Sequence, residues 1–386
     1  MDRALRVGII GGGFMGEAHA RAARSAGAEV IGVLASSQES SQRAARSLGA
    51  EAFSSVAELA GAADVVHVCS PNGLHAEHVR AVIRAGKHVV CEKPLSTDHA
   101  TADGLVREAD EAGVVASVPF VYRFHPMVRQ ARHLVQQGEI GRLLTVQGQY
   151  LQDWMLDPSA WNWRVDPAES GASRAFGDIG SHLVDLLEFV AGERIRRLSA
   201  ITSIAYPERD GHPVSTEDAA ALTVEFTGGA IGSIMVSQVN AGRKNALTIE
   251  LAGTANNIVF EQEKPDELWI GGESSTRVIS RDATVLGDDA ARLSAVPAGH
   301  PMGYVDAFAG FVRDTYAAIQ GSAPEGLPRF ADGARANQVI DAVLESARTR
   351  QWVDVGEAAV EPLAQSSSAP ASPASVTRPA TAKETA

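Results

Sequence analysis

Residues 4–27 read ALRVGIIGGGFMGEAHARAARSAG, and this stretch decides the fold. An apolar run rich in β-branched residues leads into a glycine turn, which leads into a segment with helical periodicity. A strand, a glycine turn and a helix in this order are typical of the phosphate cradle of a dinucleotide-binding unit. A flexible glycine turn is the plainer alternative, but the position between strand and helix favours the cradle.

Each glycine of the turn has a physical role. Gly11 turns the chain out of the strand, Gly13 lets a pyrophosphate approach the backbone, and Gly16 lets the helix pack closely on the strand. The helix N-terminus offers free N–H groups and a partial positive charge to phosphates. We therefore expect the turn, with Phe14 and Met15, to contact a cofactor.

Composition narrows the function classes. The chain has 386 residues, 45% of them hydrophobic, and a formal net charge of −13 without a basic cluster. Nucleic acid and anionic membrane are therefore poor partners. Cys69 and Cys91 lie in apolar, strand-like runs, which fits buried thiols in a reducing cytoplasm. The first strand begins too near Met1 to leave room for a signal peptide, and no apolar run approaches the ~20 residues that span a bilayer.

The first 122 residues alternate between strand and helix patterns. Near-continuous Val/Ile runs separated by amphipathic helices predict an α/β Rossmann domain with a doubly wound parallel sheet at residues 1–122. The expected strands are 4–11, 29–35, 63–70, 88–94 and 114–120, and the expected helices include 38–48, 73–85 and 98–112.

After Tyr122 the pattern changes to consecutive strands joined by short turns. This predicts a second domain of α+β type at 123–356, built on a mainly antiparallel sheet. The expected strands are 143–152, 196–206, 219–229, 230–239, 245–253, 256–263, 267–272 and 275–280, and the expected helices are 127–137, 181–190, 304–319 and 333–348. The last two helices are candidates to pack back on the first domain. Residues 357–386, rich in Ala, Ser, Pro and Thr, predict a disordered tail.

Two segments of the sequence contain candidate catalytic residues. Lys93 follows the strand 88–94, at the edge of the sheet where ligands bind, and could polarise a substrate hydroxyl. A surface lysine in a turn is an equal alternative from position alone, and the peptide before Pro94 is a candidate cis bond. Asp178 and His182, spaced i and i+4, would meet on one face at the start of a helix and could act as a general base pair. A helix cap with a packed histidine is the alternative that these residues alone favour.

Together with the glycine turn, further motifs suggest a family. They are SPNGLH at 70–75, EKP at 92–94, YRFHP at 122–126, WR at 163–164 and DIGSH at 178–182. In this order they resemble the Gfo/Idh/MocA oxidoreductases over roughly residues 4–355. The resemblance implies a Rossmann domain, an open-sheet domain, NAD(P), and oxidation of a secondary hydroxyl (or reduction of the ketone) on a sugar or cyclitol. It also implies that the open-sheet domain at 123–356 binds the substrate and joins the subunits of a homo-oligomer, a dimer or tetramer.

The resemblance assigns roles to individual residues. Lys93, Asp178 and His182 match the catalytic trio: His182 takes the hydroxyl proton, Lys93 steadies the alkoxide, and Asp178 positions both. The further cofactor set is Ser70, Asn72, His75, Glu92, Lys93, Trp163 and Arg164. The expected substrate set is Lys93, Tyr122, Arg123, Trp154, Arg174, Asp178 and His182. The tryptophan-rich loop YLQDWMLDPSAWNWR looks most similar to members that act on anhydro-sugars or glycosides.

The sequence departs from the family pattern in two places, one of which bears on the substrate and the other on the cofactor. Arg174 stands where many relatives carry small residues, so an acidic or glycosylated substrate is conceivable. The second strand ends at Ser36 and Ser37 without the carboxylate of an NAD-selective site, and Arg43 lies one or two turns away. We therefore predict that NADP is tolerated or preferred.

The sequence gives little sign of a metal site or of another catalytic site. His75 and His78 lack the HExxH spacing, and no Cys/His cluster fits a metal, so we expect no metal requirement. His19 and His67 fit ordinary packing. The alternatives to a dehydrogenase are a non-catalytic dinucleotide sensor, and a reductase of another C=O or C=N substrate on the same scaffold.

Overall fold

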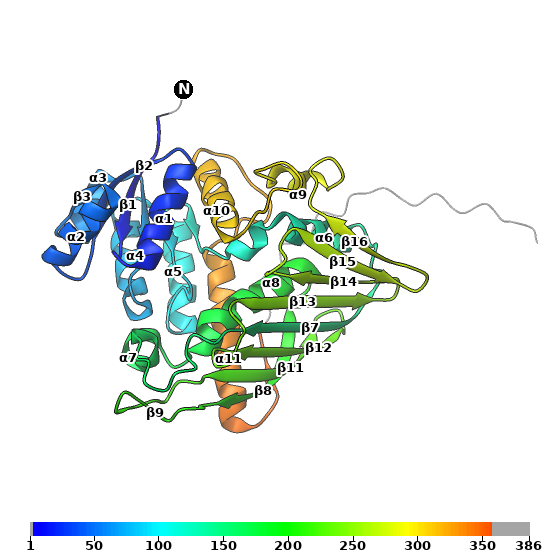
Figure 1. The fold of residues 1–386 in the computed structure, drawn as a ribbon. Coiled ribbons are helices and arrows are strands. Elements are labelled where there is room, and N and C mark those ends of the chain that lie inside the picture. Colours follow the sequence, from blue (N-terminus) through cyan, green and yellow to red (C-terminus); the bar gives the residue numbers. More distant parts are fainter. Residues whose placement is uncertain (1–2, 357–386) are drawn as a thin grey trace, which may run out of the picture. The chain divides into compact units, whose positions relative to one another are not determined.

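The computed structural model describes residues 3–356, so the predicted tail at 357–386 lies outside the described residues. The N-terminal half is a six-stranded parallel sheet in the order β3-β2-β1-β4-β5-β6 (Figure 1). Its strands are β1 (Arg6–Ile10), β2 (Glu29–Leu34), β3 (Glu51–Ala52), β4 (Val65–Val68), β5 (His88–Cys91) and β6 (Ala116–Ser117). This confirms the predicted doubly wound sheet.

Five helices join these strands. They are α1 (Phe14–Ser25), α2 (Gln38–Leu48), α3 (Val56–Ala62), α4 (His75–Arg84) and α5 (His99–Glu111). Ser37, Ser55 and Asp98 cap α2, α3 and α5 by accepting a backbone N–H with the side chain. The sequence analysis missed α3, because its seven residues span barely two turns and show little periodicity.

The second half is a nine-stranded mixed sheet in the order β16-β15-β14-β13-β7-β12-β11-β8-β17. Its strands are β7 (Leu143–Leu151), β8 (Ile195–Ser203), β11 (Ala219–Phe226), β12 (Ile231–Ser237), β13 (Ala246–Gly253), β14 (Asn256–Glu261), β15 (Glu267–Gly272), β16 (Thr276–Ser280) and β17 (Val353–Asp354). A separate small ribbon pairs β9 (Glu208–Arg209) with β10 (His212–Pro213). The sheet is mostly antiparallel, as predicted, but β7 lies between β12 and β13 and runs parallel to β12. The strands β12 and β13, which are consecutive in the sequence, are therefore not neighbours in the sheet.

Helices cover one face of this sheet (Figure 1). They are α6 (Pro126–Gln136), α8 (Ser181–Ala191) and α11 (Phe330–Thr349). Two short helices, α7 (Pro167–Ser170) and α9 (Asp288–Arg292), lie in the connections. Apolar side chains of α8, including Leu183 and Leu187, are buried against the sheet.

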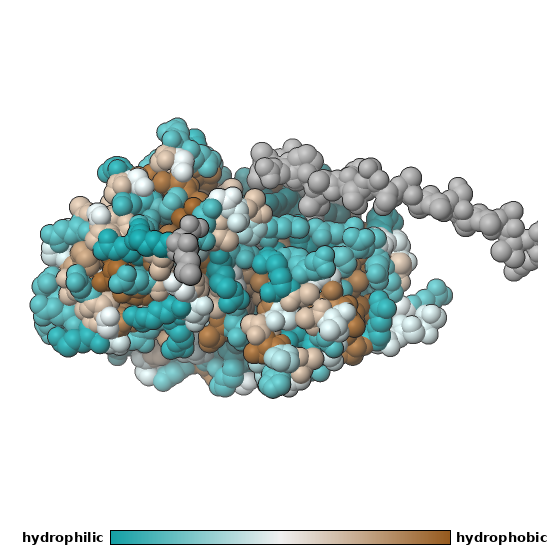
Figure 2. Space-filling view, turned by 90° about the horizontal axis from the view of Figure 1, so that it is seen from above, coloured by the Kyte–Doolittle hydropathy of each residue, from teal (hydrophilic) through white to brown (hydrophobic). Residues whose placement is uncertain are grey.

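The C-terminal helices also contact the first half of the chain. Helix α10 (Tyr304–Ile319) packs on α1, and α11 packs on α5. Phe308 and Phe311 of α10 share one apolar cluster with Val7 and Ile9 of β1. On the face drawn in Figure 2, teal polar residues cover most of the surface, with smaller brown areas between them. Within residues 3–356, the structure has no helix that combines the length and hydropathy needed to cross a bilayer.

Candidate functional site

A groove of about 820 Å³ runs over the glycine turn between β1 and α1. Its lining includes Gly11, Gly13, Phe14 and Met15, and reaches the ends of β2 and β4. Gly11 has φ +111°, and a Cβ there would lie 2.4 Å from the Cys69 carbonyl oxygen. A Cβ at Gly13 would meet nothing within 4 Å, so the bare backbone faces open space. A Cβ at Gly16 would lie 2.0 Å from the Gly11 carbonyl oxygen. The turn therefore has the geometry that a bound pyrophosphate needs.

The far end of the groove is lined by polar residues that follow β2. Ser36 and Arg43 lie there, as expected, and so does Ser40, which the sequence analysis missed. Ser37 is not among the lining residues, because its hydroxyl accepts the Ser40 N–H and caps α2. Arg43 forms an ion pair with Glu39 at 2.5 Å and donates to Ser40 Oγ at 2.9 Å.

A second pocket, of about 540 Å³, continues from the groove toward the nine-stranded sheet. The two cavities share Phe14, Met15, Cys69, Ser70, Trp163 and Arg164. The second pocket is also lined by Asn72, His75, Glu92, Lys93, Tyr122, Tyr150, Gln152, Trp154, Asn162, Asp178, His182, Asn245 and Tyr304. One continuous space thus joins a dinucleotide-sized groove to a chamber that contains the three expected catalytic residues.

Lys93 and Asp178 are in direct contact in this chamber. Lys93 lies two residues after β5 and precedes a cis peptide to Pro94, and Asp178 lies in a π-helical turn (Phe176–Gly180) before α8. Lys93 Nζ donates to Asp178 Oδ1 at 2.6 Å and to the Asp178 main-chain oxygen at 2.8 Å. Arg164 Nε lies 3.7 Å from the same Oδ1 atom. Burial raises the pKa of Asp178, but the charges of Lys93 and Arg164 outweigh it and hold the pKa well below 3.8.

His182 lies one turn after Asp178 but does not pair with it as the spacing suggested. Gln238 of the segment after β12 donates to Asp178 Oδ2 at 2.8 Å instead. The His182 ring packs edge-on against Tyr122 and Phe120, and its Nδ1 is buried without a partner among the described residues. Burial, followed by the charge of Lys93, lowers the pKa of His182 from 6.5 to about 3. The imidazole is therefore neutral near pH 7.

A chain of uncharged hydrogen-bonding groups lines the second pocket. Tyr122 and Tyr150 share a hydroxyl contact at 2.6 Å, and Tyr150 donates to Asn245 Oδ1 at 2.7 Å. Gln152 donates to the same oxygen at 2.9 Å, and Trp154 Nε1 donates to Gln152 Oε1 at 2.9 Å. We call these five residues the polar wall. Sequence analysis found Tyr122 and Trp154; the other three come from β7 and the β13 approach, where strand alternation alone gives no sign of a site.

Three further residues of the expected cofactor set, Ser70, His75 and Asn72, line the second pocket. Ser70 lies in both cavities, and its hydroxyl contacts His78 Nδ1 at 2.9 Å. His75 is fully buried, and both its ring nitrogens lie 2.9 Å from backbone carbonyls, those of Ser70 and Pro94. Its ring thus links the Ser70 and Pro94 main chains and has both nitrogens occupied. Asn72 lines the pocket while donating to the Ser170 carbonyl at 3.1 Å.

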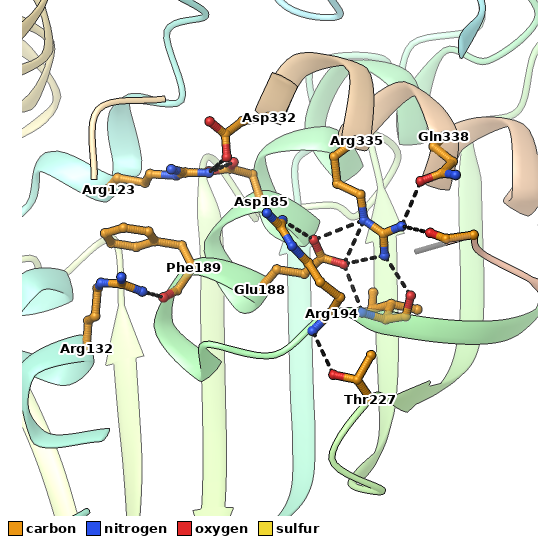
Figure 3. Close-up of polar contacts among 12 residues, drawn as sticks. Arg123, Arg132, Asp185, Glu188, Phe189, Arg194, Thr227, Asp332, Arg335 and Gln338 are labelled. Atoms are coloured by element: carbon orange, nitrogen blue, oxygen red, sulfur yellow. Dashed lines mark hydrogen bonds and ion pairs between the residues drawn. The ribbon is translucent and has the colours of Figure 1, made fainter. Parts of the chain in front are cut away.

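Arg123 does not reach the pocket, which corrects its assignment to substrate. Its side chain is buried, and Nε donates to Asp185 Oδ2 at 2.8 Å while Nη2 donates to Asp332 Oδ1 at 2.8 Å (Figure 3). The guanidinium also lies over the Phe189 ring, 4.7 Å from its centroid. Arg123 therefore joins α8 to α11 and serves the fold.

Arg174 is also corrected. Its side chain is completely buried and paired with Asp218, which Arg209 contacts at 2.8 Å from the other side. It is not among the residues of either cavity. The expectation of an acidic substrate, which depended on Arg174, therefore loses its support.

Comparisons with known proteins agree with this geometry. The model described as "Oxidoreductase family, NAD-binding Rossmann fold" matches residues 5–120, and the GFO/IDH/MocA C-terminal domain matches residues 128–259. Levoglucosan dehydrogenase of Pseudarthrobacter phenanthrenivorans is 34% identical over 91% of this chain and 98% of its own. A solved levoglucosan dehydrogenase in complex with NADH and levoglucosan superposes with TM-score 0.86 at 32% identity, covering 92% of this chain and all of that one. An inositol dehydrogenase homolog from Azotobacter vinelandii, complexed with NAD+, gives TM-score 0.83 at 27% identity, covering 92% of this chain and 98% of that one.

Proposed function

Because this chain belongs to the Gfo/Idh/MocA family and is an NAD(P)-dependent oxidoreductase acting on CH–OH groups, we propose that Lys93, Asp178 and His182 carry out its chemistry. The single observation behind this proposal is the contact of Lys93 with Asp178 beside a neutral His182, where the dinucleotide groove opens into the pocket. A bound nicotinamide exchanges a hydride with the carbon that bears the substrate hydroxyl.

The three residues divide the remaining work. A lysine ammonium has three donors, and two of those on Lys93 go to Asp178, which leaves the third for the substrate oxygen. This donor would stabilise the negative charge that develops on that oxygen. His182 would accept the hydroxyl proton at Nε2, since its Nδ1 is buried. Asp178 keeps the ammonium in place.

We propose an uncharged cyclic sugar as the substrate, with a levoglucosan-type anhydro-sugar as the first candidate. All five residues of the polar wall are neutral, and they offer hydroxyl and amide groups that match sugar hydroxyls. The two cations of the pocket, Lys93 and Arg164, both face Asp178. A phosphate or carboxylate on the substrate would have to share these two cations with Asp178, and burying an incompletely paired anion is costly. The name of the 34% identical relative points the same way.

We propose that the enzyme accepts NADP as well as NAD. Ser36, Ser40 and Arg43 lie at the end of the groove where the adenosine ribose of a dinucleotide binds in such folds. Hydroxyls and a guanidinium suit a 2′-phosphate, and no carboxylate is among the lining residues there.

We also propose that the enzyme is a homo-oligomer joined through the uncovered face of the nine-stranded sheet. Ile201, Ala221 and Met235 are aligned across β8, β11 and β12, and Ile201 and Met235 are 56% and 41% exposed. Ile231 and Trp269 are also exposed. Light scattering on Ile201→Lys/Met235→Lys should show a smaller particle than the parent, and a particle of unchanged mass would contradict this face. For location we propose the cytoplasm, in line with the two free cysteines.

A cofactor-reduction screen tests the substrate proposal. Levoglucosan, glucose, inositols and glucose 6-phosphate would each be offered with NAD and with NADP. We expect a neutral cyclic sugar to be oxidised at least about tenfold more efficiently, in kcat/KM, than its phosphorylated counterpart. Asn245→Ala should raise KM for the best substrate while leaving cofactor affinity intact. Preference for the phosphorylated sugar would contradict the proposal.

A further inference from the structure

A buried chain of four polar side chains runs from the interior of the first domain to the pocket. Tyr316 Oη of α10 lies 3.1 Å from His67 Nε2 of β4, and His67 Nδ1 lies 2.8 Å from His19 Nδ1 of α1. His19 Nε2 lies 2.9 Å from Oε1 of Glu92, which follows β5. His19 and His67 are fully buried, and Tyr316 and Glu92 are nearly so. The catalytic trio does not use this chain, and ordinary packing, the sequence-based interpretation of the two histidines, does not account for its continuity.

The hydrogen bonds of the chain end on the Glu92 carboxylate. An ionised carboxylate only accepts, so His19 Nε2 must donate to Glu92. The two Nδ1 atoms of His19 and His67 face each other, and His67 Nε2 faces the Tyr316 hydroxyl, so each ring is held at both of its nitrogens. Burial and the neighbouring His19 keep the pKa of His67 well below 6.5, which fits a neutral ring. Burial raises the pKa of Glu92, but the hydrogen bond from His19 and the nearby charge of Lys93 hold it below 4.5.

The other oxygen of Glu92, Oε2, accepts the Lys93 backbone N–H at 3.2 Å, and the side chain reaches the reaction chamber. Glu92 lines the pocket together with Phe14, Met15, Lys93 and His182, at the carboxyl end of β5. In a parallel sheet of this kind the nicotinamide half of the cofactor occupies this end, beside the catalytic groups. A fixed negative charge there discriminates between the two cofactor states, because the oxidised nicotinamide ring is a cation and the reduced ring is neutral.

We propose that Tyr316, His67 and His19 are positioning residues that hold Glu92 oriented and charged, and that Glu92 favours binding of the oxidised over the reduced cofactor. The enzyme is thereby set to begin with the oxidised dinucleotide and to release the reduced one after alcohol oxidation. This inference depends on the proposed position of the nicotinamide beside Lys93.

The test compares dissociation constants of the oxidised and reduced cofactor in the absence of sugar, by fluorescence titration and competition. In Glu92→Gln, the ratio of the oxidised to the reduced dissociation constant should rise about tenfold. Glu17→Gln, on the exposed side of α1, is the matched control, and its ratio should equal that of the parent. A structural lesion would weaken both cofactor forms equally, so equal loss or an unchanged ratio in Glu92→Gln overturns the inference.

A second pair of variants tests the positioning role independently of Glu92. His19→Leu removes the donor to Glu92, and the ratio should rise about threefold as the carboxylate loses its orientation and part of its charge. His19→Gln retains an amide donor and a carbonyl acceptor, so it should restore most of the parent ratio. Equal ratios in the two variants would overturn the role of the chain. Failure of the parent protein to bind either dinucleotide would instead contradict the cofactor site itself.

Discussion

Gln238 donates its side-chain amide to Asp178 Oδ2 at 2.8 Å, while Lys93 holds the other oxygen of the same carboxylate at 2.6 Å. Gln238 is fully buried, and its main chain accepts the Met155 N–H at 3.1 Å. The Asp178 carboxylate is therefore held at both oxygens, by Lys93 after β5 in the first domain and by Gln238 after β12 in the second.

Removing the Gln238 amide should slow catalysis, because Gln238 acts on the reaction through Asp178 and not by touching the substrate. In Gln238→Met we expect kcat to fall by a factor of about ten, because an ionised carboxylate loses a hydrogen bond in a buried site. Loss of a donor to the charged form raises the pKa of Asp178, so the acidic limb of the kcat/KM profile should move to higher pH. Gln136→Met, exposed on α6, is the matched control and should behave as the parent. An unchanged pH profile would contradict the positioning role.

The low pKa of His182 predicts an unusual acid tolerance. A histidine with a pKa of 6.5 would be mostly protonated at pH 5 and could no longer accept the hydroxyl proton, whereas a pKa of about 3 leaves the ring neutral. We therefore expect kcat/KM for alcohol oxidation to show no inflection near 6.5 that belongs to His182. His182→Asn should lower kcat by about 10²- to 10⁴-fold at every pH while cofactor titrations stay unchanged. An inflection near 6.5 that disappears in His182→Asn would contradict the neutral buried ring.

Removing the charge of Lys93 should separate catalysis from cofactor binding. In Lys93→Met we expect kcat to fall about 10²- to 10⁴-fold, because the developing alkoxide loses its only ammonium donor among the described pocket residues. Asp178 would also lose its closest cation, so its pKa should rise. Stopped-flow measurement of the hydride-transfer step identifies the effect. A variant that retains most of the parent rate would show that Lys93 has no catalytic part.

Selection between NADP and NAD should depend on Arg43 and its partner. Arg43→Gln removes the cation at the end of the groove, so affinity for NADP should fall about tenfold while affinity for NAD changes little. Glu39→Gln releases Arg43 from its 2.5 Å ion pair and should raise affinity for NADP by a few fold. Calorimetric titration of both cofactors into both variants measures the effect. Equal losses for NAD and NADP in Arg43→Gln would place the guanidinium outside the 2′-phosphate site.

The sequence predicted those parts of the molecule that depend on local order. The strand, glycine turn and helix at residues 4–27 needed no distant partner, and neither did the position of Lys93 after β5. Asp178 and His182 could be found from their spacing and the family motif. Ser40 could have been found too, since it lies in the first turn of α2, between Ser36 and Arg43 in the sequence.

Contacts between residues far apart in the sequence could not be predicted from local sequence patterns. The insertion of β7 between β12 and β13 brings Tyr150 and Gln152 beside Asn245, almost a hundred residues later, and no periodicity encodes that register. The arginines were misassigned for the same reason. Arg123 finds Asp185 at a separation of 62 residues, and a charge seen in sequence does not reveal its distant partner.

The buried ion pair of Arg174 and Asp218 predicts a stability effect where the sequence suggested a substrate contact. Asp218 faces Arg174 and Arg209, and its Oδ2 accepts the Ala205 N–H at 2.7 Å. Asp218→Asn leaves two buried guanidinium groups without an anion, so the free energy of unfolding should fall by about 3–5 kcal/mol. Burial raises the pKa of Asp218, but Arg174 and then Arg209 hold it below 3.8, so the stabilisation is complete above that value and is lost as the pH falls through the lower pKa. Urea denaturation at pH 7 measures the loss, and KM for the sugar should stay within about twofold of the parent. A stable Asp218→Asn protein with a strongly raised KM would restore Arg174 to the substrate site.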